Sequence, residues 1–292
     1  MFEQLGLVGC GLMGGSFALA LKRAGLVKRV VGYSKSPSTT ERARQMGVID
    51  IEAPSALLAV SGADIVLLAV PVSATESTFK AIRHLVSPDA LIMDVGSTKR
   101  DVVDAARRVL RDRLGCFVPA HPITGREVSG VEHADADLYV GKQVILTPIE
   151  RTFTAQLKRA VDVWTGIGCH VRQMSPHSHD AAYAAVSHLP HLIAFALMNA
   201  ITAQSQGAEF LSLAGPGFRD FTRIAASDPT MWRDVLLSNR EELLAQSRHF
   251  KASLEALEKM IESGQTDELE SAIDEASQVR AKWRISAPKS SS

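Results

Sequence analysis

Four short stretches of this 292-residue sequence carry side chains that could move a proton or hold an anion. In chain order these side chains are Ser97, His121, the pair His188 and His191, and the group Arg219, Arg223 and Trp232. An imidazole changes its charge near neutral pH, and a guanidinium can bind a carboxylate through two parallel hydrogen bonds. These residue types are therefore compatible with an acid–base site that binds an anionic ligand.

Each of these side chains also has a purely structural interpretation. Ser97 could cap a helix, and a histidine at a strand end is as often structural as catalytic. His188 and His191 stand three residues apart and could form a buried pair on one helix. A metal site built from these two and from His177 and His179 is disfavoured, because no carboxylate is spaced to complete it. We therefore expect no metal.

A glycine-rich turn near the start of the chain indicates a cofactor. It follows a strand-like stretch over 2–8 and precedes a helix-like stretch over 15–21. In a GxGxxG turn the first glycine allows the tight bend, the second admits a pyrophosphate, and the third lets the helix pack closely on the strand. Free N–H groups at the helix start then bind the phosphates. The residues of this predicted dinucleotide site are Gly9, Gly11, Leu12, Met13 and Gly14.

The end of the second strand-like stretch, 28–34, bears on which dinucleotide is bound. NAD-selective sites have an acidic residue there, which hydrogen-bonds the ribose 2′-hydroxyl. This sequence instead has Ser34, Lys35 and Ser36. Two hydroxyls and one ammonium group favour a 2′-phosphate, so we predict NADP, or NADP and NAD alike, as the cofactor. The alternative is that these three are ordinary turn residues.

Strand-like and helix-like stretches alternate as far as residue 174. The continuous apolar run over 63–70 is typical of an interior parallel strand. Further strands are expected over 90–95, 116–120, 142–147 and 168–174, and helices over 75–85, 99–109 and 153–164. The alternation predicts an α/β fold with a Rossmann-type doubly wound parallel sheet. Ser97 and His121 then follow strand C-termini, where such sheets place their sites.

Only helical patterns follow residue 177. We expect a helix over 177–206 with a kink at Pro190, a longer helix over 231–263, and a last one over 266–283. The longer one carries an apolar seam of residues spaced seven apart, namely Leu236, Leu243, Phe250 and Leu257. The predicted organisation is a dinucleotide-binding domain over 1–174, an all-helical domain over 175–285 and a flexible tail over 286–292.

The composition is that of a soluble globular protein, with 46% hydrophobic and 22% charged residues. Its 32 Lys+Arg balance 32 Asp+Glu, which gives no field that would attract nucleic acid. Three scattered cysteines without a CxxC pair, and no signal peptide, predict a cytoplasmic location. The most membrane-like stretch, 184–203, contains two histidines, Pro190 and Asn199, so we expect a buried helix there and no membrane span.

Five motifs, taken together and in order, resemble those of the prephenate/arogenate (cyclohexadienyl) dehydrogenases of tyrosine biosynthesis. They are Gly-x-Gly-x-Met-Gly at 9–14, Asp-Val-Gly-Ser-Thr-Lys at 94–99, His-Pro-Ile-Thr-Gly-Arg-Glu-x-Ser-Gly at 121–130, Ser-His-Leu-Pro-His at 187–191 and Gly-Phe-Arg-Asp-Phe-Thr-Arg-Ile-Ala at 217–225. The first is shared by many dehydrogenases, and the last two are specific. The resemblance implies oxidative decarboxylation of prephenate to 4-hydroxyphenylpyruvate, with hydride transfer to NAD(P)⁺.

The resemblance also implies a role for individual residues. His121 would accept the proton of the ring hydroxyl, and Ser97 would hydrogen-bond near that hydroxyl and orient His121. Arg223 would bind a substrate carboxylate. The remaining implied residues are His191 as a substrate contact, Glu127 as an entrance gate that acts through an ion pair, and Trp232 as part of the pocket lining. The site would lie in a cleft between the two domains, and the apolar seam makes us expect a homodimer built mainly from the helical domain.

Other functions stay open at this point. Arogenate carries an amino group where prephenate has a keto group, away from the reacting carbon, so the same residues serve either substrate or both. A β-hydroxyacid dehydrogenase would share the glycine turn, but it would need a lysine on the first long helix of its second domain, and 177–206 contains none. A non-catalytic NAD(P)-binding sensor would need neither His121 nor Arg223. The sequence also leaves open the choice between NAD and NADP, feedback inhibition by tyrosine, and the roles of Arg126 and Pro216.

Overall fold

The computed structural model describes residues 1–284, so the tail expected over 286–292 lies outside the described residues. The chain divides into two compact units, Met1–Arg240 and a second unit that begins at Glu241. The first unit holds both the sheet and the helices that follow it, up to residue 240. The domain limits expected from the sequence, 1–174 and 175–285, remain a prediction.

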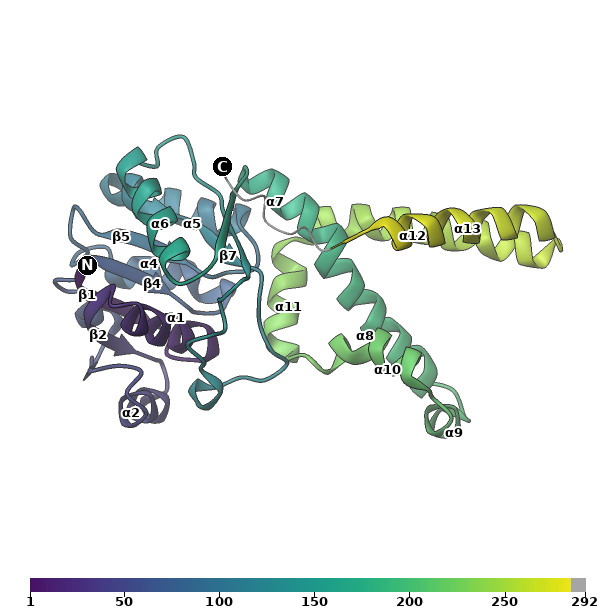
Figure 1. Cartoon of the computed structure of the whole chain (residues 1–292), viewed down its shortest axis with the longest axis horizontal. Helices are drawn as coiled ribbons and strands as arrows, with labels where there is room; N and C mark the ends of the chain where they lie inside the picture. Colours follow the sequence, from purple (N-terminus) through teal and green to yellow (C-terminus); the bar gives the residue numbers. More distant parts are fainter. Residues whose placement is uncertain (285–292) are drawn as a thin grey trace. The chain divides into compact units, whose positions relative to one another are not determined.

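A six-stranded parallel sheet forms the centre of the first unit (Figure 1). Its order is β3-β2-β1-β4-β5-β6, which confirms the predicted Rossmann-type fold. The strands are β1 (Phe2–Val8), β2 (Val27–Tyr33), β3 (Ile51–Glu52), β4 (Ile65–Leu68), β5 (Leu91–Asp94) and β6 (Phe117–Val118). The chain order reverses between β1 and β4, and doubly wound sheets bind their ligands beyond the carboxyl ends of the strands at this point.

Helices cover both faces of the sheet, which explains the uninterrupted apolar runs of its strands. The side chains of Ile65 and Leu67 in β4 face a core shared with α1 (Leu12–Arg23) and α6 (Thr154–Gly166). Their neighbours Val66 and Leu68 face the opposite core, shared with α3 (Ala56–Ala59), α4 (Thr75–Ile82) and α5 (Arg100–Val109). Helix α2 (Pro37–Gln45) connects β2 to β3.

A second, three-stranded sheet contains β7 (Ala120–Pro122), β8 (Gln143–Leu146) and β9 (His170–Gln173). The expectation that these strands extend the parallel sheet is wrong, because β7 runs antiparallel to β8. Pro119 separates β6 from β7 and has no N–H to donate to a strand ladder, so the first ladder ends at Val118. The break turns His121 in β7 away from the parallel sheet.

The helix expected over 177–206 consists of α7 (Pro176–Tyr183), a π-helical segment (Ala184–His188) and α8 (Leu189–Thr202). The irregularity lies just before Pro190, where a kink was predicted, because proline cannot supply the N–H of a regular helix. By length and composition Pro176–Thr202 could cross a membrane, and only 17% of its most apolar window is buried. The expected buried helix is therefore largely uncovered in the single chain.

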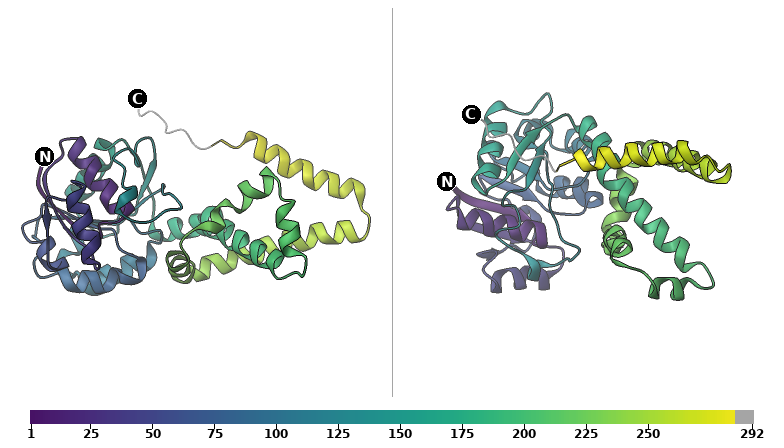
Figure 2. Two further views of the ribbon diagram at one scale, coloured as in Figure 1. Left: turned by 90° about the horizontal axis from the view of Figure 1, so that it is seen from below. Right: turned by 45° about the vertical axis from the view of Figure 1, so that its right-hand side comes forward.

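The expected helix over 231–263 is two helices, α11 (Pro229–Ser238) and α12 (Arg240–Glu262), and this prediction was wrong. Asn239 interrupts it, since its side-chain amide donates to the carbonyl of Asp180 over 2.8 Å and lies 3.1 Å from Nδ1 of His188. The shorter helices α9 (Gly207–Ser212) and α10 (Pro216–Thr222) precede α11. In the second unit, a short turn connects α12 to α13 (Thr266–Lys282), and the two helices diverge from this turn (Figure 2, left).

Candidate active site

The glycine turn between β1 and α1 has the shape that a dinucleotide requires. Gly9 has φ +100°, and a Cβ there would lie 2.2 Å from the carbonyl oxygen of Ala69. A Cβ on Gly14 would lie 2.1 Å from the carbonyl oxygen of Gly9. At Gly11, the N-cap of α1, a Cβ would meet no protein atom within 4 Å. The turn is therefore tight at two glycines and open at the one where a pyrophosphate approaches.

The residues after β2 support this turn. The backbone N–H of Cys10 donates to Oγ of Ser34 over 2.8 Å, and the N–H of Ser34 donates to Oγ1 of Thr40. Lys35 and Ser36 are exposed, and Ser36 is the N-cap of α2. Burial raises the pKa of the Cys10 thiol to about 11, so Cys10 serves as a small filler of the turn. Ser34 thus shapes the turn, while Lys35 and Ser36 are accessible to a ligand.

A buried ion pair fixes the main chain beside His121. Lys99 and Asp94 form the pair, and both side chains are almost wholly buried. Oδ1 of Asp94 accepts from the N–H of Ala120 over 3.0 Å, and Nζ of Lys99 donates to the carbonyl of Ala120 over 2.8 Å. Both backbone groups of the residue before His121 are thus held from β5 and the following loop. Ser97 lies partly buried in that loop.

The ring of His121 is held by a chain of two further side chains. Its Nδ1 lies 2.8 Å from Nε2 of His179, and Nδ1 of His179 lies 2.7 Å from Oδ1 of Asp180. The carboxylate of Asp180 also accepts from the N–H groups of Lys99 and Arg100, over 2.8 and 2.9 Å. It therefore accepts hydrogen bonds from backbone N–H groups at the start of α5 that have no partner within the helix, and a negative charge is favoured at this end of a helix.

The hydrogen-bond chain assigns the protons of both rings. A carboxylate only accepts, so Nδ1 of His179 carries a proton and its Nε2 is an acceptor. Nδ1 of His121 must then be the donor to His179, which leaves Nε2 of His121 as the atom with a free lone pair. His121 is partly buried, whereas His179 is wholly buried. The structure thus presents a neutral imidazole with one basic nitrogen available to a ligand.

The surroundings keep these groups in the required charge states. Burial lowers the pKa of His121 well below its ordinary value, and the neighbouring His179, Lys99 and His188 lower it further. Burial also lowers the pKa of His179, although Asp180 opposes this. Burial alone would raise the pKa of Asp180, but the hydrogen bonds from His179 and from backbone N–H groups outweigh it and lower this pKa. At neutral pH both imidazoles are therefore neutral and Asp180 is charged.

A second cluster gathers residues from the helices and from the loop after β7. Arg223 forms an ion pair with Glu127, and both side chains are well exposed. The ring of His191 stacks on Trp232, with centroids 3.5 Å apart and planes inclined by 21°. His191 also feels the charges of Arg223 and Glu127. The structure therefore brings together four of the residues singled out in the sequence.

His188 connects the two clusters. It interacts electrostatically with both His121 and His191, and its ring lies 6.1 Å from that of Trp232. Burial lowers the pKa of His188 to about 4. Because Asn239 donates to its Nδ1, the proton of His188 is on Nε2. Of the two neighbouring histidines, His188 is therefore the buried structural one and His191 the accessible one.

Several residues of the site were missed by the sequence analysis, namely Asp94, Lys99, His179, Asp180, Tyr183 and Asn239. The ring of Tyr183 lies 4.5 Å from that of His179 and 5.0 Å from that of His121. The adjacent His-Asp pair was the available signal, but only a metal site was considered for His179. Within residues 1–284, no group of three or more His, Cys, Asp or Glu side chains could hold a metal ion. Arg126 pairs with Asp135, at 2.5 Å.

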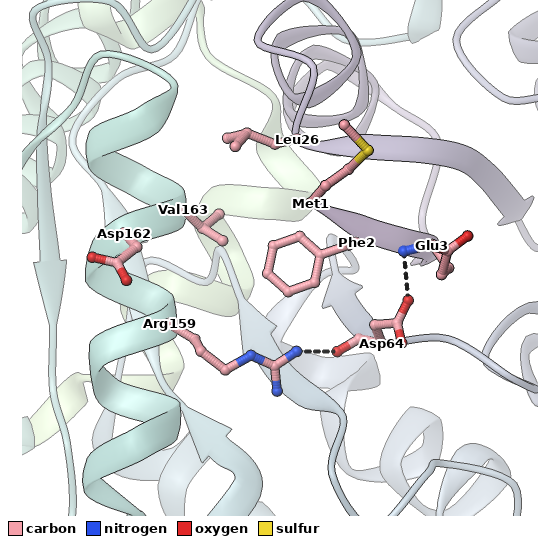
Figure 3. Close-up of a pocket in the computed structure, with 8 residues that line it drawn as sticks. All are labelled: Met1, Phe2, Glu3, Leu26, Asp64, Arg159, Asp162 and Val163. Atoms are coloured by element: carbon pink, nitrogen blue, oxygen red, sulfur yellow. Dashed lines mark hydrogen bonds between the residues drawn. The ribbon is translucent and has the colours of Figure 1, made fainter.

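A separate pocket of about 400 Å³ lies at the amino end of β1 (Figure 3). Met1, Phe2, Leu26, Asp64, Arg159 and Val163 are among its lining residues. The glycine turn follows the carboxyl end of the same strand. Since doubly wound sheets bind dinucleotides at the carboxyl ends, this pocket is not the nucleotide site.

The first compact unit holds a basic nitrogen, a cation and a turn that fits a dinucleotide. His121 offers a basic nitrogen, Arg223 a guanidinium, and Gly11 an uncrowded start of helix α1, where the first N–H groups have no partner within the helix. A hydroxyl whose proton is taken by an imidazole while its carbon loses a hydride is oxidised to a carbonyl. The combination fits a dehydrogenase that acts on a carboxylate-bearing alcohol.

Comparison with known proteins agrees with this chemistry. Residues 17–173 match the family described as prephenate dehydrogenase, nucleotide-binding domain, and residues 175–275 match prephenate dehydrogenase, dimerization domain. Prephenate dehydrogenase of Bacillus subtilis is 36% identical over 92% of this chain and 73% of its own length. Cyclohexadienyl dehydrogenase of Zymomonas mobilis is 34% identical over 96% of each chain. The crystal structure of prephenate dehydrogenase from Aquifex aeolicus with hydroxyphenyl propionate and NAD⁺ has a TM-score of 0.90 at 38% identity, and covers 97% of this chain and 98% of its own.

Gly11 and Gly14 differ in the space around them, so substituting each by alanine tests whether the turn binds a dinucleotide. Gly11→Ala should leave the thermal unfolding midpoint unchanged and weaken NAD⁺ and NADP⁺ binding, because its methyl group enters the space of the pyrophosphate. Gly14→Ala should lower the free energy of unfolding by about 1–3 kcal/mol, because its methyl group meets backbone atoms. Calorimetric titration and thermal unfolding measure both. Unchanged cofactor affinity in Gly11→Ala would contradict the assignment.

Proposed function

Because the chain belongs to the prephenate dehydrogenase family, we propose that His121 acts as the base for the ring hydroxyl of prephenate, while Arg223 binds a substrate carboxylate. The protein is an NAD(P)-dependent oxidoreductase of this family. The observation that carries the proposal is the free Nε2 lone pair of His121, which follows from its bond to His179. Ser97, which is partly buried in the loop after β5, is assigned in this proposal to orient the same hydroxyl.

The reaction requires few groups from the protein. Prephenate loses a hydride from its hydroxyl-bearing carbon, and its ring carboxylate leaves as carbon dioxide while the ring becomes aromatic. NAD(P)⁺, when bound at the glycine turn, accepts the hydride. His121 takes the hydroxyl proton, which makes that carbon a better hydride donor. The depressed pKa of His121 keeps the imidazole neutral and able to accept this proton below pH 6.5 as well as above it.

Arg223 and Glu127 support a binding step at the entrance of the site. Their ion pair is exposed, and an exposed pair contributes at most about 1 kcal/mol. A substrate carboxylate can therefore replace Glu127 on the guanidinium at little cost, which gives Glu127 the part of a gate. His191 and Trp232, stacked beside this pair, form a wall against which the substrate is held.

The cofactor in this proposal is NADP⁺, or NADP⁺ and NAD⁺ alike. The exposed ammonium group of Lys35 and the hydroxyl of Ser36 at the start of α2 support it, since both can hold a 2′-phosphate. Ser34 contributes by holding the glycine turn in place.

Arogenate, or both substrates, is the second candidate. The 34% identity to a cyclohexadienyl dehydrogenase over 96% of each chain favours it. Steady-state assays of prephenate and arogenate, each with NAD⁺ and NADP⁺, decide among these possibilities. Activity with neither substrate under any pairing would overturn the proposed function.

The proposal also includes that the protein is a homodimer and is located in the cytoplasm. The match to a dimerization domain over 175–275 supports it, as does the uncovered apolar surface of Pro176–Thr202. Phe250, Leu254 and Ile261 of α12 are also exposed. A second copy of the chain, rather than a lipid bilayer, would cover helix Pro176–Thr202, because this helix carries His188, Pro190 and Asn199.

His121→Asn should lower kcat by roughly 10²–10⁴-fold, because the asparagine side chain cannot accept the proton. The dissociation constant for NAD⁺ should stay within about twofold of the original, since the glycine turn is unchanged. Steady-state kinetics and calorimetric titration measure the two effects. Loss of cofactor binding without a specific effect on kcat would show that His121 is structural.

Arg223→Ala should raise the KM for prephenate by roughly 10- to 100-fold, the effect of losing a charged hydrogen bond. Arg219→Ala is the matched control, because Arg219 is an exposed arginine of the neighbouring helix α10 that pairs with Asp220. Its KM should not change. An unchanged KM in Arg223→Ala would remove this residue from substrate binding.

Light scattering of the purified protein at micromolar concentration, without detergent, should give twice the mass of the 31.5 kDa chain. Phe250→Glu should weaken this association by placing a charge in the apolar seam, whereas Lys251→Glu should not. A monomeric original protein would contradict the proposed dimer.

A further inference from the structure

We propose that His179 and Asp180 are positioning residues for the reaction, which fix Nε2 of His121 as the basic atom and stabilise the positive charge that His121 acquires. This inference rests on the proposed function, because it needs His121 as the base. Two short contacts, of 2.7 and 2.8 Å, join Asp180, His179 and His121 in one line.

The proton balance of the reaction shows why a hydrogen-bonded link between His121 and a carboxylate is useful. Prephenate and NAD(P)⁺ give 4-hydroxyphenylpyruvate, carbon dioxide and NAD(P)H, and no proton is released overall. The proton that His121 takes from the hydroxyl is therefore needed again on the phenolic oxygen of the product. Between proton removal and aromatisation, the protein holds one extra positive charge on the imidazole.

The groups around His121 disfavour a positive charge on its ring unless a negative charge stabilises it. The ring is enclosed by wholly or partly buried groups, and the ammonium group of Lys99 opposes an imidazolium. Asp94 neutralises Lys99 directly. The buried carboxylate of Asp180 is joined to His121 through the ring of His179.

The hydrogen bonds that join His121, His179 and Asp180 can stabilise the positive charge of His121 while every group keeps the same partner. When Nε2 of His121 is protonated, its Nδ1–H donates more strongly to Nε2 of His179. The Nδ1–H of His179 in turn donates to a carboxylate that two backbone N–H groups already hold in place. The arrangement resembles in its logic a carboxylate that orients a catalytic histidine, with one imidazole inserted between them.

Other titratable groups face this chain and bear on any pH dependence. From the strands and loops they are Lys99 and Asp94, and from the helices they are Tyr183 and His188. The pKa of Tyr183 is raised to about 12 by burial, and that of His188 is lowered to about 4. Both groups therefore keep one protonation state between pH 5 and 9, where the profile is measured.

The test uses His179→Phe and His179→Gln in the full-length protein. The phenylalanine variant removes the acceptor from Nδ1 of His121, so kcat should fall by roughly 100-fold while the KM for prephenate and the affinity for NAD⁺ stay within about twofold. The glutamine variant offers an amide acceptor and should recover part of kcat. His177→Phe, an exposed position two residues earlier in α7, is the control and should keep full activity.

The pH profile separates this role from simple packing. His179 lowers the pKa of His121 because the two rings compete for positive charge, but a neutral His179 accepts from the Nδ1–H of His121 and connects it to Asp180. His179→Phe removes this acceptor from the imidazolium, so the acid limb of kcat/KM should move to lower pH. Thermal unfolding controls for loss of structure, and His179→Gln keeps the test valid if the phenylalanine variant does not fold. Full kcat and an unmoved acid limb in both variants would overturn the inference. Loss of activity in His121→Asn would at the same time leave the proposed function standing.

Discussion

The buried carboxylate of Asp180 is the group on which the site depends. It accepts hydrogen bonds from the backbone of Lys99 and Arg100 and from the ring of His179, and its own carbonyl accepts from Asn239. A carboxylate so placed would destabilise the fold if these donors were missing. Its hydrogen bonds therefore fix the start of α5, the end of α7 and the break before α12 relative to one another.

Two buried carboxylates divide the task of holding His121. Asp94, with Lys99, holds both main-chain groups of the preceding residue, whereas Asp180 acts on the ring through His179. The position of the imidazole and the location of its proton are thus set before a ligand arrives. In the proposed role of His121 as the base, a ring fixed in this way would need little reorganisation during the reaction.

The groups assigned to substrate binding are held quite differently. Arg223 and Glu127 form an exposed ion pair, and such pairs exchange partners at small cost in free energy. The stacked rings of His191 and Trp232 provide the firm surface next to it. In the proposed function, a base held rigidly and a cation that exchanges its partner would suit an enzyme that must first admit a charged substrate and then act on it.

The sequence by itself determined the features that depend on local pattern. The alternation of strand-like and helix-like stretches up to residue 174 predicts a Rossmann-type fold, and motifs that are short and contiguous, such as those around His121 and Arg223, indicate the family. Tertiary structure decided the rest, because the deciding contacts join distant residues. His179 meets His121 across 58 positions, and Asp180 meets Lys99 across 81. Asn239 ends a helix that local propensity would continue, since its side chain gains partners on another helix.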